Sequence, residues 1–135
     1  MKLIKIYSLI SFLFLLSCGH KDDNRFIITH NGSRTDIYCF ILKHELSSVS
    51  ISEFNFSQKA VVPNNKSYDH VDKLTWEEFI KTCDNQKIRF FIVKKDSIDK
   101  YGWKEIFKKN IYNKKCLFTI EDLDKINWEI NYIGE

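Results

Sequence analysis

The chain has 135 residues, of which 21 are Lys or Arg and 18 are Asp or Glu, so its formal net charge is +3. Two of the basic residues, Lys2 and Lys5, precede an apolar run at the N-terminus, and the remaining 19 nearly balance the acids. Nucleic-acid-binding proteins carry a clear excess of basic residues along one stripe, so this balance excludes that class of partner. The four glycines form neither a glycine-rich phosphate loop nor a Gly-x-Ser-x-Gly nucleophile motif.

Residues 1–17 have the organisation of a signal peptide: a basic start, a short apolar core from Ile6 to Leu16, and the small residue Ser17 before Cys18. The apolar core is shorter than the about 17–25 residues that a membrane-spanning helix needs. The Leu-Leu-Ser-Cys sequence instead predicts a lipoprotein leader, in which the thiol of Cys18 takes up a diacylglycerol and its freed amine is acylated. The alternative is an ordinary signal peptide with an incidental cysteine. Lipidation implies a membrane partner, because two or more acyl chains anchor a protein firmly.

Residues 18–24 form a predicted tether. Lys21, Asp22 and Asp23 follow the cysteine closely, and a Lys with two acidic residues at this place resembles the export signal of Bacteroidetes surface lipoproteins. The resemblance implies an outer-membrane lipoprotein that faces the cell exterior. The alternative interpretation is a solvated linker, because charge runs are usually exposed.

The predicted elements of residues 25–135 begin with strands. Residues 25–29 and 36–43 are strand-like and flank Asn31-Gly32, which predicts a hairpin turn. The second of these runs is apolar on both faces and predicts an interior strand. A weaker strand is expected from Val49 to Phe56, and Pro63-Asn64-Asn65 predicts a turn with strands on either side.

Helices and strands then alternate. Thr75 and Glu78 predict a capping box, followed by apolar residues at helical spacing. Ile88 to Val93 predicts an interior strand. A second helix is expected from about Ile98 to Lys109, capped by Asp96 or Ser97 and weakened by Gly102.

The C-terminal part predicts a strand from Lys115 to Ile120, a short helical turn opening at Thr119 to Asp122, and a strictly alternating strand from Asn127 to Tyr132. Residues 25–135 therefore predict a single α+β domain, with an antiparallel sheet or sandwich-like core and two short helices packed on it. The 118 residues left after the leader suffice for one such core.

The last third of the chain resembles a family of small Bacteroidetes lipoproteins. The similarity rests on Trp103-Lys104-Glu105-Ile106, on Lys114-Lys115 before a strand, and on Leu117 to Trp128 with the closing Ile130-Asn131-Tyr132. The first half agrees more loosely, through the Asn-Gly-Ser turn and Val62 to Asn65. The resemblance implies a cellular location and supplies no activity.

No catalytic residue, cofactor or metal ligand set is predicted. The histidines share no spacing that would place two of them on one face, and Glu121, Asp122 and Asp124 are better explained by the dipole of a short helix than by a catalytic dyad. The three cysteines of the mature chain allow at most one disulfide, of which Cys39–Cys116 is conceivable. The histidines are His20, His30, His44 and His70, and the third cysteine is Cys83.

Two further surface features are expected. Asp96-Ser97-Ile98 resembles the O-glycosylation acceptor of exported Bacteroidetes proteins, with a helix cap as the alternative role of Ser97. The three tryptophans are expected in the core, whereas Tyr38, Tyr68, Tyr101, Tyr112 and Tyr132 are free to line a groove.

These features favour a surface-displayed, lipid-anchored module of the cell envelope that acts by binding, or as an accessory to a larger complex, with an envelope protein or a glycan as partner. One alternative is a small envelope-anchored hydrolase whose site is assembled from scattered residues around His44 or His70. Another is an immunity or shielding lipoprotein.

Overall fold

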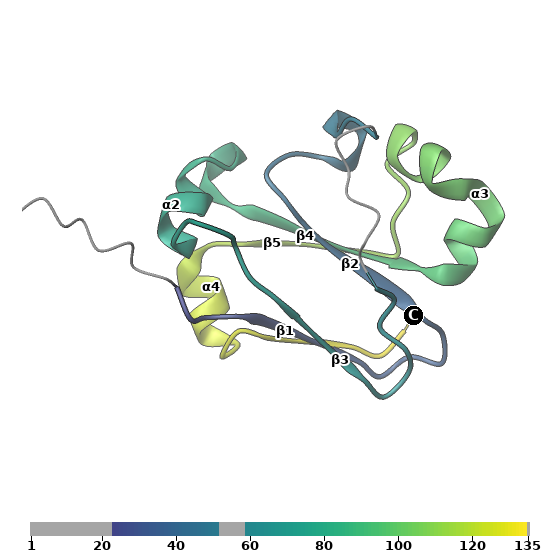
Figure 1. Ribbon diagram of the computed structural model, residues 1–135, viewed down its shortest axis with the longest axis horizontal. Coiled ribbons are helices and arrows are strands. Elements are labelled where there is room, and N and C mark those ends of the chain that lie inside the picture. The colour runs from purple at the N-terminus through teal and green to yellow at the C-terminus, as the bar shows by residue number, and fades with distance from the viewer. Residues whose placement is uncertain (1–22, 52–58, 135) are drawn as a thin grey trace, which may run out of the picture.

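Two three-stranded sheets pack face to face in the computed structural model, which describes residues 23–51 and 59–134 (Figure 1). One sheet has the order β3-β1-β6, with β3 at Lys66–Asp69, β1 at Ile27–Asn31 and β6 at Glu129–Tyr132. The other has the order β2-β4-β5, with β2 at Ile37–Leu42, β4 at Ile88–Lys94 and β5 at Lys114–Phe118. The predicted α+β class with a sandwich-like core is confirmed. All strand pairs are antiparallel except β1–β6, which is parallel.

Three α-helices accompany the sheets: α2 (Trp76–Lys81), α3 (Lys95–Lys108) and α4 (Ile120–Lys125). The short 3-10 helices η2 (Leu46–Ser48) and η3 (Asp84–Gln86) complete the described elements. Helices α2 and α4 lie at one end of the sandwich, and α3 covers the outer face of the β2-β4-β5 sheet (Figure 1). No helix in the described ranges is long and apolar enough to span a membrane.

The predicted hairpin at Asn31-Gly32 is wrong, because β1 and β2 belong to different sheets. A two-residue type I′ turn needs positive φ at both central residues, and neither Asn31 nor Gly32 has it. The buried Asn31 amide instead donates to the carbonyls of Val61 (2.7 Å) and Thr35 (2.8 Å), and its oxygen accepts from the Ser33 backbone N–H (3.0 Å). These bonds direct the chain from one sheet into the other.

Strand β4 carries the core on both of its faces. Ile88, Phe90 and Ile92 point towards the β3-β1-β6 sheet, whereas Phe91 and Val93 pack against α3 and η2. A strand covered on both faces reads as a continuous apolar run, so the prediction of an interior strand is confirmed here.

The same prediction is wrong for β2, which is an edge strand of its sheet. Beyond it the described residues contribute a single bridge, between Ile37 and Val61. Its side chains are nevertheless packed on both faces, with Ile37 and Cys39 facing the other sheet and Phe40 facing α3. A continuous apolar run therefore indicates that both faces of a strand are covered. It does not indicate whether the strand has a neighbouring strand on each side.

The capping box that begins α2 is confirmed. Thr75 accepts a hydrogen bond from the Glu78 N–H (3.2 Å), and the Glu78 carboxylate accepts one from the Thr75 N–H (2.8 Å). A second capping box, between Thr119 and Asp122, extends the predicted helical turn into the short helix α4.

Helix α3 differs from the prediction at its start. Its N-cap is Lys94, and neither Asp96 nor Ser97 caps it, because the helix begins directly at the end of β4. Gly102 has φ 74° and ψ 155°, which are not helical angles, so α3 is broken at this residue. The sequence had predicted that this glycine weakens the helix.

The strands expected at 25–29, 115–120 and 127–132 are present with shifted bounds, as β1, β5 and β6, whereas only an isolated bridge at Val61 precedes the turn at Pro63. Strand β6 begins at Glu129 because Asn127 and Trp128 have φ of 52° and 62°, outside the range of extended chain. Strand β3 follows the turn at Pro63-Asn64. The strand expected from Val49 to Phe56 is absent over residues 49–51, and the rest of it lies outside the described residues.

Candidate functional site

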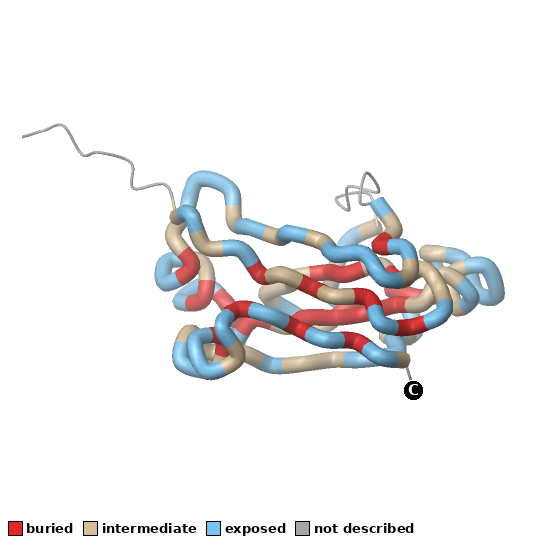
Figure 2. Tube along the Cα trace, turned by 90° about the horizontal axis from the view of Figure 1, so that it is seen from below, coloured by how far each residue is buried: buried red, intermediate tan, exposed pale blue. Residues whose placement is uncertain are grey.

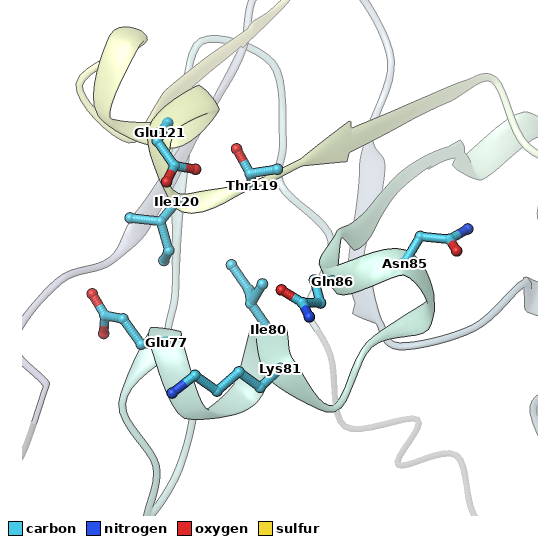
Figure 3. Close-up of a pocket in the computed structure, with 8 residues that line it drawn as sticks. All are labelled: Glu77, Ile80, Lys81, Asn85, Gln86, Thr119, Ile120 and Glu121. Atoms are coloured by element: carbon cyan, nitrogen blue, oxygen red, sulfur yellow. The ribbon is translucent and has the colours of Figure 1, made fainter.

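An open groove between α2, η3 and the start of α4 encloses about 600 Å³ and is the candidate site (Figure 3). We call it the α2–α4 groove. One side is formed by α2 and another by the start of α4, while η3 closes the third side (Figure 3). Its eight lining residues are Glu77, Ile80, Lys81, Asn85, Gln86, Thr119, Ile120 and Glu121.

The local sequence explains why these side chains converge. The capping box at Thr75 fixes the first turn of α2, so Glu77 and Lys81, four residues apart, project from the same side of the helix. Between them Ile80 is buried against the core. The second capping box, at Thr119, sets the start of α4 and thereby places Ile120 and Glu121 opposite α2.

The third side of the groove depends on an unusual backbone. Asn85 and Gln86 have φ of 54° and 52°, which is uncommon for residues other than glycine. Gln86 in particular is not a residue type that favours this region, so the surrounding structure must hold it there. This backbone places Asn85 and Gln86 in the lining of the groove, where the Gln86 amide faces Ile80 and Asn85 lies further out (Figure 3).

Charges of both signs face the groove. Arg25 donates to Glu77 over 2.6 Å, and this hydrogen bond holds the pKa of the Glu77 carboxyl below its ordinary value. Glu121 lies opposite, and Lys81 supplies an ammonium group. With two amides added, the rim offers both hydrogen-bond donors and acceptors around a floor of two isoleucines.

The groove offers hydrogen-bonding groups but no hydroxyl or thiol nucleophile that is free and paired with a base. The one hydroxyl group in the lining belongs to Thr119, and its oxygen already accepts a hydrogen bond from the Asp122 N–H as a helix cap. The lining contains no histidine, serine or cysteine, so it lacks a nucleophile paired with a base. The carboxylates, the ammonium group and the amides of the lining can all hydrogen-bond to a polar ligand.

The histidines of the described ranges lie apart, each beside a different carboxylate. His44 is 2.9 Å from Asp84 and His70 is 2.9 Å from Asp72, whereas His30 is 3.3 Å from Glu129. No group of three or more potential metal ligands occurs among the described residues. Two smaller cavities, of about 260 and 250 Å³, flank His70, and their other lining residues include no second histidine.

The cysteines of the described chain are all free, so the conceivable Cys39–Cys116 bridge is not formed. Burial raises the pKa of the Cys39 thiol to about 12, and it raises those of Cys83 and Cys116 as well. A thiol with a raised pKa is a poor nucleophile, so these side chains serve as small apolar residues.

Of the predicted site residues, Cys18, Lys21 and Asp22 lie outside the described residues, and Asp23 is the first residue within them. The Asp23 carboxylate is 6% exposed, accepts the Trp76 N–H at the start of α2 (2.9 Å) and pairs with Arg25 (2.6 Å). Its pKa is held well below the ordinary value, chiefly by the hydrogen bond from Arg25. The third position of the predicted export signal is therefore also a structural residue of the domain.

The remaining predictions concern single side chains. Ser97 lies in the first turn of α3, where its hydroxyl donates to the Asn113 side-chain oxygen (3.2 Å). Trp76 and Trp128 are buried, and Trp103 is partly buried against Phe40. The tyrosines do not line a common groove, because Tyr132 is buried and Tyr68 and Tyr101 lie on different elements.

Sequence reasoning identified both helix starts but not the groove between them. The capping box at Thr75 and the helical turn at Thr119 were predicted, yet nothing in the sequence indicated that α2 and α4 share one end of the sandwich. Asn85 and Gln86 gave no signal, since their left-handed backbone depends on the contacts around them.

Comparison of the chain with protein-family models, with curated proteins and with solved structures finds no match to any of the three.

Proposed function

We propose that this protein is a lipid-anchored lipoprotein of the outer membrane, displayed on the cell surface, which acts by binding a partner through the α2–α4 groove. The observation that carries the proposal is the Leu-Leu-Ser-Cys sequence ending at Cys18, only five residues before the start of the described domain at Asp23. A leader that ends directly at a folded domain suits anchoring, because acyl chains on Cys18 would hold the whole domain at the membrane.

The groove supports a binding role for the exposed domain. A polar rim with donors and acceptors around an apolar floor suits a ligand that carries hydroxyl or amide groups, such as an envelope glycan or a peptide segment of an envelope protein. The Lys21-Asp22-Asp23 sequence supports display on the outer face through its resemblance to an export signal.

The anchoring part of the proposal predicts that Cys18→Ala releases the protein from membranes. Fractionation of the native host should then find the variant in the soluble fraction, because no acyl chain can be attached. Cys116→Ala is the matched control, since it removes a partly exposed thiol of the folded domain and should leave membrane association unchanged. Continued membrane association of Cys18→Ala would refute the lipid anchor.

The binding part predicts that the groove contacts a partner in intact cells. A photo-crosslinking amino acid at Lys81 or Glu121 should form a discrete adduct on irradiation, because both positions line the groove. The same amino acid at Tyr101, an exposed position on α3, should not form that adduct. Identical adduct patterns at all three positions would show that the groove has no special role.

A further inference from the structure

The outer face of the β3-β1-β6 sheet has no helix over it in the described chain, unlike the outer face of the other sheet. Strand alternation places nine residues on this face, three from each strand and its extension. Figure 2 views the molecule from the side of this sheet and shows buried residues alternating with less buried ones along its strands. We call this surface the open sheet face; its residues are Phe26, Ile28, His30, Lys66, Tyr68, His70, Glu129, Asn131 and Ile133.

Contacts between strands confirm that these side chains share one surface. Ile28 lies directly opposite Tyr68 across the β1–β3 pair. The rings of Phe26 and His70 meet edge to face at 5.5 Å, and His30 lies 3.3 Å from Glu129 on β6. The surface is thus continuous across all three strands.

The open sheet face exposes large apolar side chains. Ile133 is 76% exposed, Tyr68 is 60% exposed and Phe26 is 40% exposed. Large apolar side chains exposed along one sheet face make it a candidate interaction surface. Tyr68 combines an apolar ring with a polar hydroxyl, and Lys66 combines an apolar stem with a charge, which are the properties of side chains at a membrane–water interface.

The position of the anchor limits what can cover this face. Cys18 and Asp23 are five residue steps apart, so lipid on Cys18 holds Asp23 within about 18 Å of the bilayer surface. Asp23 is fixed to the domain through Trp76 and Arg25, and Phe26 follows only three residues later, at the edge of the open sheet face. A lipid on Cys18 therefore keeps the Phe26 end of this face close to the bilayer.

Other parts of the surface near the anchor suit lipid less well. The α2–α4 end exposes the carboxylates of Glu78, Glu121 and Asp124, which would lose hydration against a bilayer. On the open sheet face the one carboxylate is that of Glu129, which lies 3.3 Å from the His30 ring. Helix α3 lies far from the tether end of the molecule (Figure 1).

We propose that the open sheet face rests on the surface of the bilayer that holds the lipid on Cys18, so that the domain lies side-on. Phe26, Tyr68 and Ile133 then reach the boundary between headgroups and acyl chains. The α2–α4 groove remains open at the end of the domain, and α3 points away from the membrane. This proposal rests on the lipid anchor proposed above.

The test uses lipidated protein purified from its host and reconstituted into phosphatidylethanolamine–phosphatidylglycerol vesicles. Three variants carry one environment-sensitive fluorophore each, at Tyr68→Cys, Lys81→Cys or Tyr101→Cys, in a Cys116→Ala background that removes the partly exposed native thiol. Nitroxide-labelled lipid is the quencher, and mass spectrometry of each preparation establishes the state of Cys18.

With Cys18 lipidated, we expect the fluorophore at position 68 to lose most of its emission to the nitroxide lipid, and those at positions 81 and 101 to keep theirs. Equal emission at all three positions would overturn the side-on arrangement and leave the anchor intact. Quenching at position 81 or 101 in place of 68 would overturn it in favour of another orientation. A preparation whose Cys18 is bare would remove the anchor and this proposal together.

Discussion

Asp23 is the residue at which the predicted tether becomes part of the fold. Its carboxylate accepts hydrogen bonds from the Trp76 N–H and from Arg25, and Arg25 in turn donates to Glu77 at the edge of the groove. Arg25 also lies 4.9 Å from the ring centre of Trp128. A single carboxylate therefore joins the N-terminal segment to α2 and, through Arg25, to the segment before β6.

We predict that Asp23→Asn lowers the free energy of unfolding at pH 7 by about 1–3 kcal/mol, the usual worth of hydrogen bonds to a charged group. Urea unfolding of the purified protein measures the change. Asp72→Asn, at a carboxylate whose side chain is 85% exposed, is the control and should alter stability little. If both variants were equally stable, Asp23 would make no contribution to the stability of the folded domain.

The same residue gives a pH dependence of known sign. The pKa of Asp23 in the folded state lies below its ordinary value of 3.8, so its contribution is complete above that pH and is lost as the pH falls through the folded-state pKa. Below about pH 5 the wild type should lose stability more steeply than Asp23→Asn. Because Asp23 also stabilises the fold, the predicted export signal is best tested by replacing only Lys21 and Asp22 with alanine.

At the scale of elements, the sequence located most strands and helices but not their partners. The Ile88–Lys94 run, the Thr75 capping box and the alternation before Tyr132 were readable, because they depend on local periodicity and caps. The pairing of β1 with β6 was not, because those strands are about a hundred residues apart and share no local signal. Asn31-Gly32 misled because its buried amide stabilises a crossover, a contact that only tertiary structure reveals.

Helix α3 offers a direct test of a local backbone constraint. Gly102 has φ 74° and ψ 155°, a region that is essentially restricted to glycine, although a Cβ there would meet no atom within 4 Å. Gly102→Ala should therefore lower stability by about 1–3 kcal/mol through backbone strain alone. Thermal unfolding measures the change, and Lys104→Ala, at an exposed position of the same helix, is the control. If Gly102→Ala were more stable than the wild type, α3 would be more stable as a continuous helix, and the strain argument would be wrong.

At the scale of the whole molecule, the start of the described chain and the groove lie at the same end of the sandwich. Asp23 begins the described chain beside α2, and Gly134 ends it at the opposite end (Figure 1). The sequence alone indicated the leader but not the groove, because the groove forms where α2, η3 and α4 meet, with lining residues that range from Glu77 to Glu121. With a lipid on Cys18, we expect the end of the domain that holds Asp23 to lie near the membrane.

The proposed membrane anchoring and the side-on orientation both require a lipid on Cys18. The most direct measurement is mass spectrometry of the N-terminal peptide of the protein purified from its native host. We predict a mature chain that starts at Cys18 and carries a diacylglycerol thioether on its sulfur. A chain that retains residues 1–17, or one that starts with an unmodified thiol, would contradict the account.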